Sequence, residues 1–113
     1  MSTRREVVFW VAQRATAAIL AVCVIVHLAT IIYAVRGGLT AADILGRTRG
    51  SVAWGTFYAV FVMAAALHGA IGLRAVAAEW LGLRGPAAEF ATTVIGVALA
   101  MLGLRAVAAV VGT

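Results

Sequence analysis

The chain has 113 residues, of which 65% are hydrophobic and only 12% are charged. Average soluble domains carry about 45–50% apolar and about 25% charged residues. A domain of this size also leaves too much of its surface exposed to hide so many apolar side chains from water. The composition therefore excludes a water-soluble fold and predicts an integral membrane protein.

The formal net charge of +5 is the difference between nine basic and four acidic residues, and all nine basic residues are arginines. These arginines stand singly or in pairs at the edges of apolar segments and form no basic patch. Such a distribution is typical of interfacial anchors and lipid head-group contacts. The positive charge therefore does not indicate nucleic-acid binding. The single cysteine, Cys23, rules out an intrachain disulfide.

Three apolar segments reach the length of about 20 residues that a helix needs to cross a bilayer. Apolar and polar residues do not alternate along the chain, so strands are not expected. The expected helices cover about 7–35, 52–83 and 87–111, and Pro86 suits the first turn of the third. Residues 1–113 are thus predicted to form a single all-α membrane-anchor domain.

A polar segment joins the first two expected helices. Residues 39–45 within it are expected to form a short helix at the membrane surface, with Thr40 as its N-cap. The arginines are balanced between the two ends, so the positive-inside rule does not decide the orientation. Three spans place the two termini on opposite sides of the membrane.

Small residues recur at helix-packing intervals, at Ala65 and Gly69 in the second helix and at Gly96, Ala100 and Gly103 in the third. This spacing lets helix backbones approach closely in lipid. Three thin, alanine-rich helices make a poor independent unit. The helices are therefore predicted to pack against helices of another membrane chain.

His68 stands in the middle of the second helix, where an ionisable side chain is costly and usually functional. Gly69 and Gly72 beside it leave room for a flat group such as a porphyrin. An axial haem ligand needs one ring nitrogen free for iron and open space above it. On spacing alone, haem ligation and a hydrogen bond to a neighbouring helix both remain open.

His27 is the second imidazole inside an expected span. Counted from the interfacial aromatic residues at about 1.5 Å per residue, His27 and His68 are expected to differ in depth by about 8 Å. Two ligands of one iron must face each other, so a shared haem is not expected. His27 is interpreted as lying near the far interface, with a second haem as the alternative.

Three of the nine arginines, Arg14, Arg74 and Arg105, lie inside the expected spans, and Arg105 is interpreted as snorkelling to the interface. Arg14 can snorkel to the interface or hold an anionic partner, such as a propionate or a quinone head group. Arg74 follows His68 by six residues, the level at which an edge-on haem would carry its propionates. The sequence shows no nucleophile–base pair, thiol cluster or phosphate loop. No catalytic residue is therefore predicted in this chain.

The residues at 14–17, His68 with Gly72, and the pair Glu79–Trp80 resemble the hydrophobic anchor (cytochrome b) subunits of succinate dehydrogenase and fumarate reductase. The three-span layout and the length fit that family over the whole chain. Gly-Leu-Arg at 72–74 is also similar to the larger of the two anchor subunits, although the smaller is the better match. His27 resembles the first-helix histidine of larger anchors that hold two haems.

The resemblance implies a non-catalytic subunit that docks a flavoprotein and an iron–sulfur subunit beside a second anchor subunit. Electrons from succinate would then reach ubiquinone or menaquinone, with haem b between the anchor helices. His68 matches the position of the haem iron ligand. The implied quinone contacts are Arg14, Thr16, Glu79 and Trp80, although the family usually has Asp-Tyr at the last two positions. The implied location is the bacterial cytoplasmic (inner) membrane.

Three other functions compete with this one. The anchor of a different quinone-linked dehydrogenase would have the same sequence features, because the substrate is recognised by the flavoprotein, which is a separate chain. A cofactor-free anchor would tolerate replacement of both histidines. A small proton-coupled transporter needs a membrane-embedded carboxylate in its first helix and usually has four spans, whereas here only Glu6 stands at the edge of the first helix.

Overall fold

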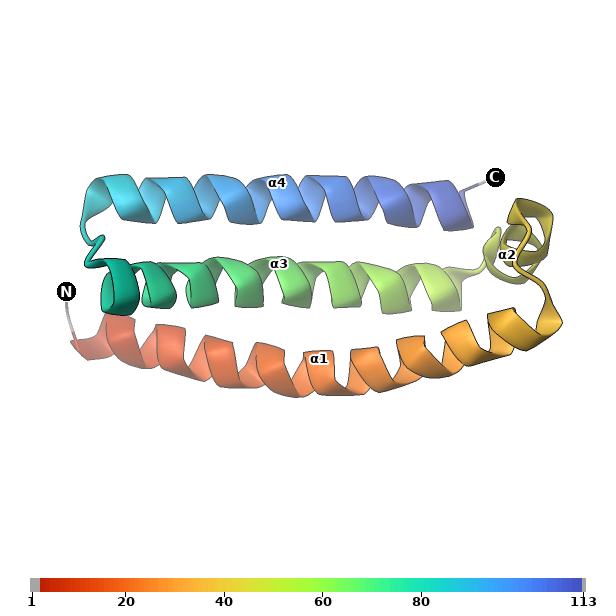
Figure 1. The fold of residues 1–113 in the computed structure, drawn as a ribbon, viewed down its shortest axis with the longest axis horizontal. Helices are drawn as coiled ribbons and strands as arrows, with labels where there is room; N and C mark the ends of the chain where they lie inside the picture. Colours follow the sequence, from red (N-terminus) through yellow and green to blue (C-terminus); the bar gives the residue numbers. More distant parts are fainter. Residues whose placement is uncertain (1–2, 113) are drawn as a thin grey trace.

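The computed structural model describes residues 3–112, which are almost entirely helical (Figure 1). The helices are α1 (Thr3–Gly37), α2 (Ala41–Thr48), α3 (Val52–Leu81) and α4 (Pro86–Val111). No strand occurs within the described range. Helices α1, α3 and α4 are long and apolar enough to cross a membrane. The prediction of an all-α membrane protein with three spans is therefore confirmed.

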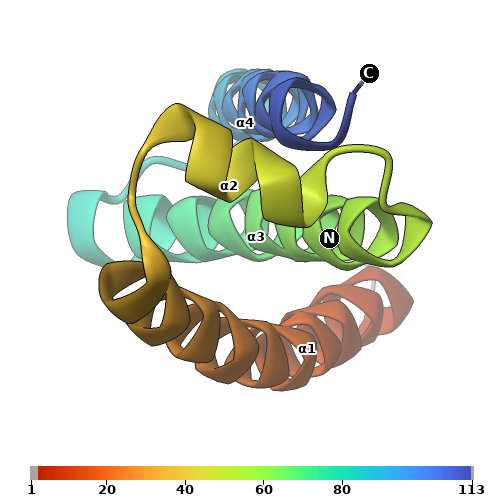
Figure 2. The same cartoon turned by 90° about the vertical axis from the view of Figure 1, so that its right-hand side faces the viewer.

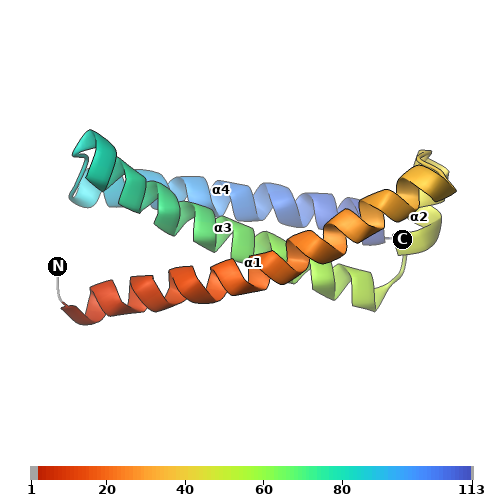
Figure 3. The same ribbon diagram turned by 60° about the horizontal axis from the view of Figure 1, so that its bottom comes forward.

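The three long helices lie side by side with α3 in the middle, and α3 packs against both α1 and α4 (Figure 1). Helix α1 curves and crosses α3 obliquely, so the two separate towards their ends (Figure 3). The two chain ends lie at opposite ends of the bundle, as three spans require. Helix α2 lies across the end at which α1 finishes (Figure 2).

Local caps account for where the helices stop. Helix α3 ends at Leu81, two residues before the predicted limit, because Gly82 adopts a left-handed conformation with φ 67°. Its N–H donates to the carbonyl oxygen of Ala77, as is common at helix C-termini. Helix α4 begins at Pro86, where a missing N–H costs nothing.

The short interfacial helix is present as α2, and Thr40 is its N-cap as predicted. The Thr40 hydroxyl accepts a bond from the Asp43 N–H at 3.1 Å, and the Asp43 carboxylate accepts one from the Thr40 N–H at 3.2 Å. The Thr40 hydroxyl also donates to that carboxylate at 2.6 Å. Because these bonds favour the ionised form, they hold the pKa of Asp43 below its ordinary value.

Helix α2 also closes the C-terminal end of α4. The Thr48 hydroxyl donates to the carbonyl oxygen of Val110 at 2.5 Å, and the Gly50 N–H donates to that of Val111 at 2.9 Å. These two carbonyl groups lie in the last turn of α4, where no further helical N–H can reach them. The segment between α1 and α3 is thereby fixed to the bundle.

Glycine sets the contact between α3 and α4. A Cβ atom built on Gly96 would lie 2.8 Å from the Cβ of Ala70, and one on Gly103 would collide with Val62. These glycines therefore mark close approaches of the two helices, as their spacing predicted. Gly69 is looser, because its nearest neighbour there would be Leu99 at 3.9 Å.

The bundle buries few side chains completely. The buried apolar residues are small for the most part: Cys23, Ala64, Ala66 and Ile71. Most of the large apolar side chains face outwards, including Ile25, Leu102 and Trp80. Lipid is as apolar as these side chains, so they can remain exposed to the bilayer or contact further membrane chains.

Candidate functional site

His68 lies in the middle of α3 and is half-buried against α1. Its Nδ1 atom lies 3.1 Å from Oγ1 of Thr16, a side chain that is only 6% exposed. The same hydroxyl lies 2.8 Å from the carbonyl oxygen of Ala12 and 3.1 Å from that of Gln13. The hydrogen bond to a neighbouring helix, one of the two roles left open for His68, is therefore present.

This contact does not compete with metal binding, because it uses only one of the two ring nitrogens. Metal-bound histidines commonly donate their other N–H to a nearby oxygen, which fixes the orientation of the ring. Thr16 provides such an oxygen, and Nε2 of His68 remains as the candidate iron ligand. The imidazole itself therefore fits the role of a haem ligand, with Nε2 as the nitrogen that would bind iron.

Gly72, one turn after His68, lies against the Gln13 side chain of α1. A Cβ atom at Gly72 would lie 3.3 Å from Nε2 of Gln13, so this side chain occupies space that was predicted to be open for a porphyrin. The Gln13 Oε1 atom is buried and has no hydrogen-bond partner among residues 3–112. Gln13 was not among the site residues predicted from the sequence. The available signal was its position three residues before Thr16, which places both on the same face of α1.

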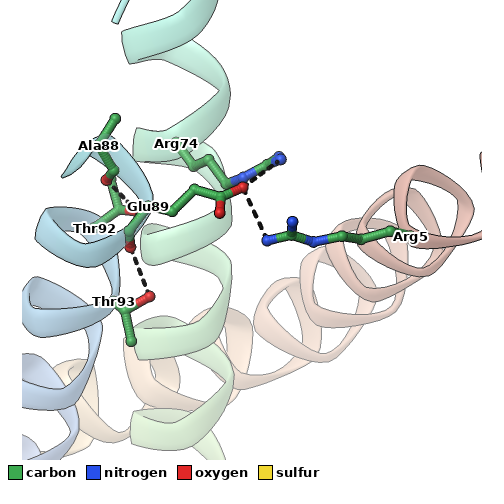
Figure 4. A network of polar contacts seen from close by, with 6 residues as sticks. All are labelled: Arg5, Arg74, Ala88, Glu89, Thr92 and Thr93. Carbon is green, nitrogen blue, oxygen red and sulfur yellow. Dashed lines mark hydrogen bonds and ion pairs between the residues drawn. The ribbon is translucent and has the colours of Figure 1, made fainter. Parts of the chain in front are cut away.

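Arg74 takes part in a charged cluster at one end of the bundle (Figure 4). Its guanidinium lies 3.3 Å from Oε1 of Glu89, and the Arg5 guanidinium reaches the same oxygen at 2.9 Å. The Arg74 guanidinium also lies over the Phe9 ring, 4.4 Å from its centroid. One carboxylate at the start of α4 thus links two arginines from α1 and α3.

The cluster closes one end of a groove of about 710 Å³ between α1 and α4, with α3 as its floor. Arg5, Arg74 and Glu89 line this groove, whereas His68 does not. The structure therefore joins Arg74 to Glu89 and does not bring it to the imidazole. Sequence analysis singled out neither Arg5 nor Glu89 for such a contact, although a carboxylate in the first turn of a membrane span is itself a signal.

The four residues predicted to contact quinone do not meet within this chain. Thr16 is buried beside His68, whereas Arg14 is exposed and lies over the Trp10 ring at 5.2 Å. Glu79 and Trp80 are exposed at the end of α3. They follow His68 by eleven and twelve residues, or about 16–18 Å along the helix.

His27 lies in an aromatic cluster between α1 and α3. Its Nδ1 atom is 3.4 Å from the Tyr58 hydroxyl, and its ring meets Phe61 edge-on with 5.6 Å between centroids. Trp54 in turn stacks on Tyr58. This cluster gives His27 two aromatic partners in α3.

The two imidazoles lie farther apart in depth than predicted. Tyr58 and Phe61, the two ring partners of His27, precede His68 by ten and seven residues of α3, so His27 and His68 are separated by about 10–15 Å along that helix. The expected value of about 8 Å was too small. It assumed that Phe9 and Trp80 lie level, whereas Phe9 packs against Arg74, six residues earlier in α3.

Comparisons with known proteins give one match. A family model described as the succinate dehydrogenase/fumarate reductase transmembrane subunit matches residues 1–110, which include the first two spans, all but the last residue of the third, and both histidines. Neither the curated proteins nor the solved structures gave a match.

Proposed function

The chain belongs to the succinate dehydrogenase/fumarate reductase transmembrane-subunit family, and from this premise we propose that it binds haem b through His68 and helps to form a quinone site. Family membership itself establishes the coarser role of a membrane anchor for catalytic subunits. The observation that carries the haem proposal is the half-buried imidazole, whose Nδ1 is engaged by Thr16 while Nε2 remains for iron.

In this proposal the haem supplies a one-electron carrier between soluble iron–sulfur clusters and the quinone. The chain holds the imidazole in one orientation and surrounds it with apolar helices, which are the means by which a protein tunes such a centre. His27 would not hold the same haem, because it lies about 10–15 Å from His68 along α3, so any further protein ligand would have to come from another chain. A second anchor subunit is the proposed source.

The proposed quinone site is likewise completed by partners. Arg14, Glu79 and Trp80 are exposed in the half of the bundle that contains the N-terminal end of α1 and the C-terminal end of α3 (Figure 1). The indole N–H of Trp80 can donate a hydrogen bond to a quinone oxygen. We propose that the flavoprotein and iron–sulfur subunits dock at this end of the bundle. The bundle itself would lie in a bacterial cytoplasmic membrane.

The deciding experiment is a dithionite-reduced minus oxidised absorption spectrum of the detergent-purified complex. Wild type is compared with His68→Ala and with the matched control His27→Ala. We expect a haem b band in wild type that disappears in His68→Ala and persists in His27→Ala. A partial loss in His27→Ala would instead assign a second haem to that residue, and a wild-type complex without any band would refute the haem proposal.

The dehydrogenase partner is tested separately in the same preparation. We expect succinate to reduce a soluble quinone analogue, and other small acids to fail as electron donors. Trp80→Phe keeps an aromatic ring at this position and removes the N–H donor, so it should raise the KM for the quinone analogue. An unchanged KM would remove Trp80 from the quinone site. Activity only with another acid would assign the anchor to a different quinone-linked dehydrogenase.

A further inference from the structure

The side chain of Thr16 lies directly behind the imidazole of His68. We propose that Thr16 is a positioning residue that fixes the tautomer of His68 and lowers the reduction potential of the haem held there. This inference rests on the proposed function, because it takes His68 as an iron ligand. It gives Thr16 a role distinct from the quinone contact that the family resemblance implied.

The direction of the hydrogen bond follows from counting protons around Oγ1 of Thr16. Three polar atoms lie within 3.1 Å of it: the carbonyl oxygens of Ala12 and Gln13, and Nδ1 of His68. A hydroxyl has one proton, and carbonyl oxygens can only accept. If that proton pointed to Nδ1, two oxygens only 2.8 Å apart would face each other without a proton between them.

The hydroxyl proton therefore lies towards the carbonyl groups of α1, as is usual for threonine inside a helix. Nδ1 of His68 must then be the donor, at 3.1 Å. A neutral imidazole with its proton on Nδ1 carries a lone pair on Nε2. Thr16 thus selects the tautomer in which Nε2 can bind iron.

The position of the hydroxyl is fixed by its surroundings. Thr16 is 6% exposed, and its branched Cβ restricts rotation about χ1. The bond to the Ala12 carbonyl further ties the hydroxyl to the backbone of α1. A fixed acceptor on Nδ1–H makes the imidazole a stronger electron donor. Because a stronger donor stabilises ferric iron more than ferrous iron, the reduction potential falls.

Helix α4 offers a matched control. Thr92 is 8% exposed, and its hydroxyl lies 3.1 Å and 3.2 Å from the carbonyl oxygens of Ala88 and Glu89, which repeats the pattern of Thr16 (Figure 4). It has no histidine contact among the residues that the structure describes. Substitution by valine removes a buried hydroxyl with little change of shape at either position.

The test is a redox titration of the haem in purified complexes that carry Thr16→Val, Thr16→Ser or Thr92→Val. Loss of the acceptor should raise the midpoint potential in Thr16→Val. A tenfold loss of preference for the ferric form corresponds to about 59 mV for a one-electron couple. Thr16→Ser keeps the hydroxyl and should remain close to wild type, as should Thr92→Val.

Several results would overturn the inference. An unchanged potential in Thr16→Val with haem retained would do so, and so would a rise of equal size in Thr16→Ser or Thr92→Val, which would indicate a packing effect. The tautomer is measured independently by ¹⁵N NMR of the imidazole in labelled wild-type and Thr16→Val chains in the haem-free state. A proton on Nε2 in wild type would refute the hydrogen-bond direction even if Thr16→Val did not assemble.

The same design separates this inference from the function on which it rests. Persistence of the haem band in His68→Ala would refute haem ligation by His68 and with it the effect of Thr16 on the potential. A band that requires His68 but has the same potential in wild type and Thr16→Val would refute the inference alone.

Discussion

Replacement of Gly96 by alanine is a direct test of the contact between α3 and α4. The new Cβ would lie 2.8 Å from Cβ of Ala70, whereas ordinary contacts begin at 3.4–4 Å. The helices would therefore have to separate by 0.6–1.2 Å. Ala70 cannot relieve the contact by rotation, because its Cβ is fixed to the backbone. The backbone of one helix must move.

Two effects of opposite sign decide the outcome. Forcing an extra methyl group into a packed interface costs about 1–3 kcal/mol, whereas glycine to alanine inside a helix gains about 1 kcal/mol of helix propensity. We therefore expect Gly96→Ala to destabilise by up to about 2 kcal/mol. Gly69→Ala is the matched control in the same interface, since its Cβ would meet Leu99 at 3.9 Å. That variant should be neutral or stabilised by up to about 1 kcal/mol.

The assay is unfolding of the purified complex by SDS in mixed micelles, followed by tryptophan fluorescence. Opposite shifts of the unfolding midpoint in Gly96→Ala and Gly69→Ala are expected. Equal stabilisation by both substitutions would show that α3 and α4 do not approach closely at Gly96, and the reasoning from packing would be refuted.

Three further predictions concern groups that tie the helices together. Glu89→Gln should lower the unfolding midpoint in the same assay more than Glu79→Gln, because Glu89 holds Arg5 and Arg74 whereas Glu79 forms no ion pair within residues 3–112. The Asp43 carboxylate has a folded-state pKa below its ordinary value of 3.8, so its stabilisation of α2 is fully present above that value and is lost as the pH falls through the lowered pKa. The protection factors of the α2 amides, which compare each exchange rate with the intrinsic rate at the same pH, should therefore fall between pH 6 and about pH 3 in wild type and much less in Asp43→Asn. His27→Ala removes two edge-on ring contacts worth about 0.5–1.5 kcal/mol each. His27→Phe retains the ring packing and should lose only about 1 kcal/mol, with the hydrogen bond between Tyr58 and the imidazole. Equal unfolding midpoints for the two variants would contradict a stabilising role for the ring contacts of His27.

The helices of this chain were predictable because their signals are local. Apolar length sets the three spans, Pro86 sets the start of α4, and Thr40 with Asp43 sets the start of α2. Each of these features acts within a few residues of its own position in the sequence. The end of α3 was misplaced by two residues because Gly82, rather than the polar turn after it, ends the helix.

The faces of the helices were not predictable in the same way. Each span is apolar all round, so no stripe of hydrophobic residues marks the side that turns inwards. Whether His68 faces Thr16 or Arg74 faces Glu89 depends on the angle at which α1 crosses α3 and on the tight contact at Gly96 (Figure 3). These are properties of the packed bundle. Sequence reasoning therefore placed the imidazole at mid-helix but did not predict the ion pair between Arg74 and Glu89.

The positions of the two imidazoles limit what a single copy of this chain can do. Thr16 and Tyr58 each contact Nδ1 of one histidine, and the two rings lie about 10–15 Å apart along α3. Two ligands on one iron must face each other across the metal, so His27 cannot complete a haem site begun by His68. If His68 binds haem b, the opposite ligand has to come from a second chain, packed against apolar side chains that this bundle leaves exposed. The chain expressed without its partners should then hold haem far more weakly than the purified complex. A fully haem-loaded species that is monomeric by light scattering would place both ligands in one copy and contradict the separation of the rings, whereas a loaded dimer would identify the second chain as another copy.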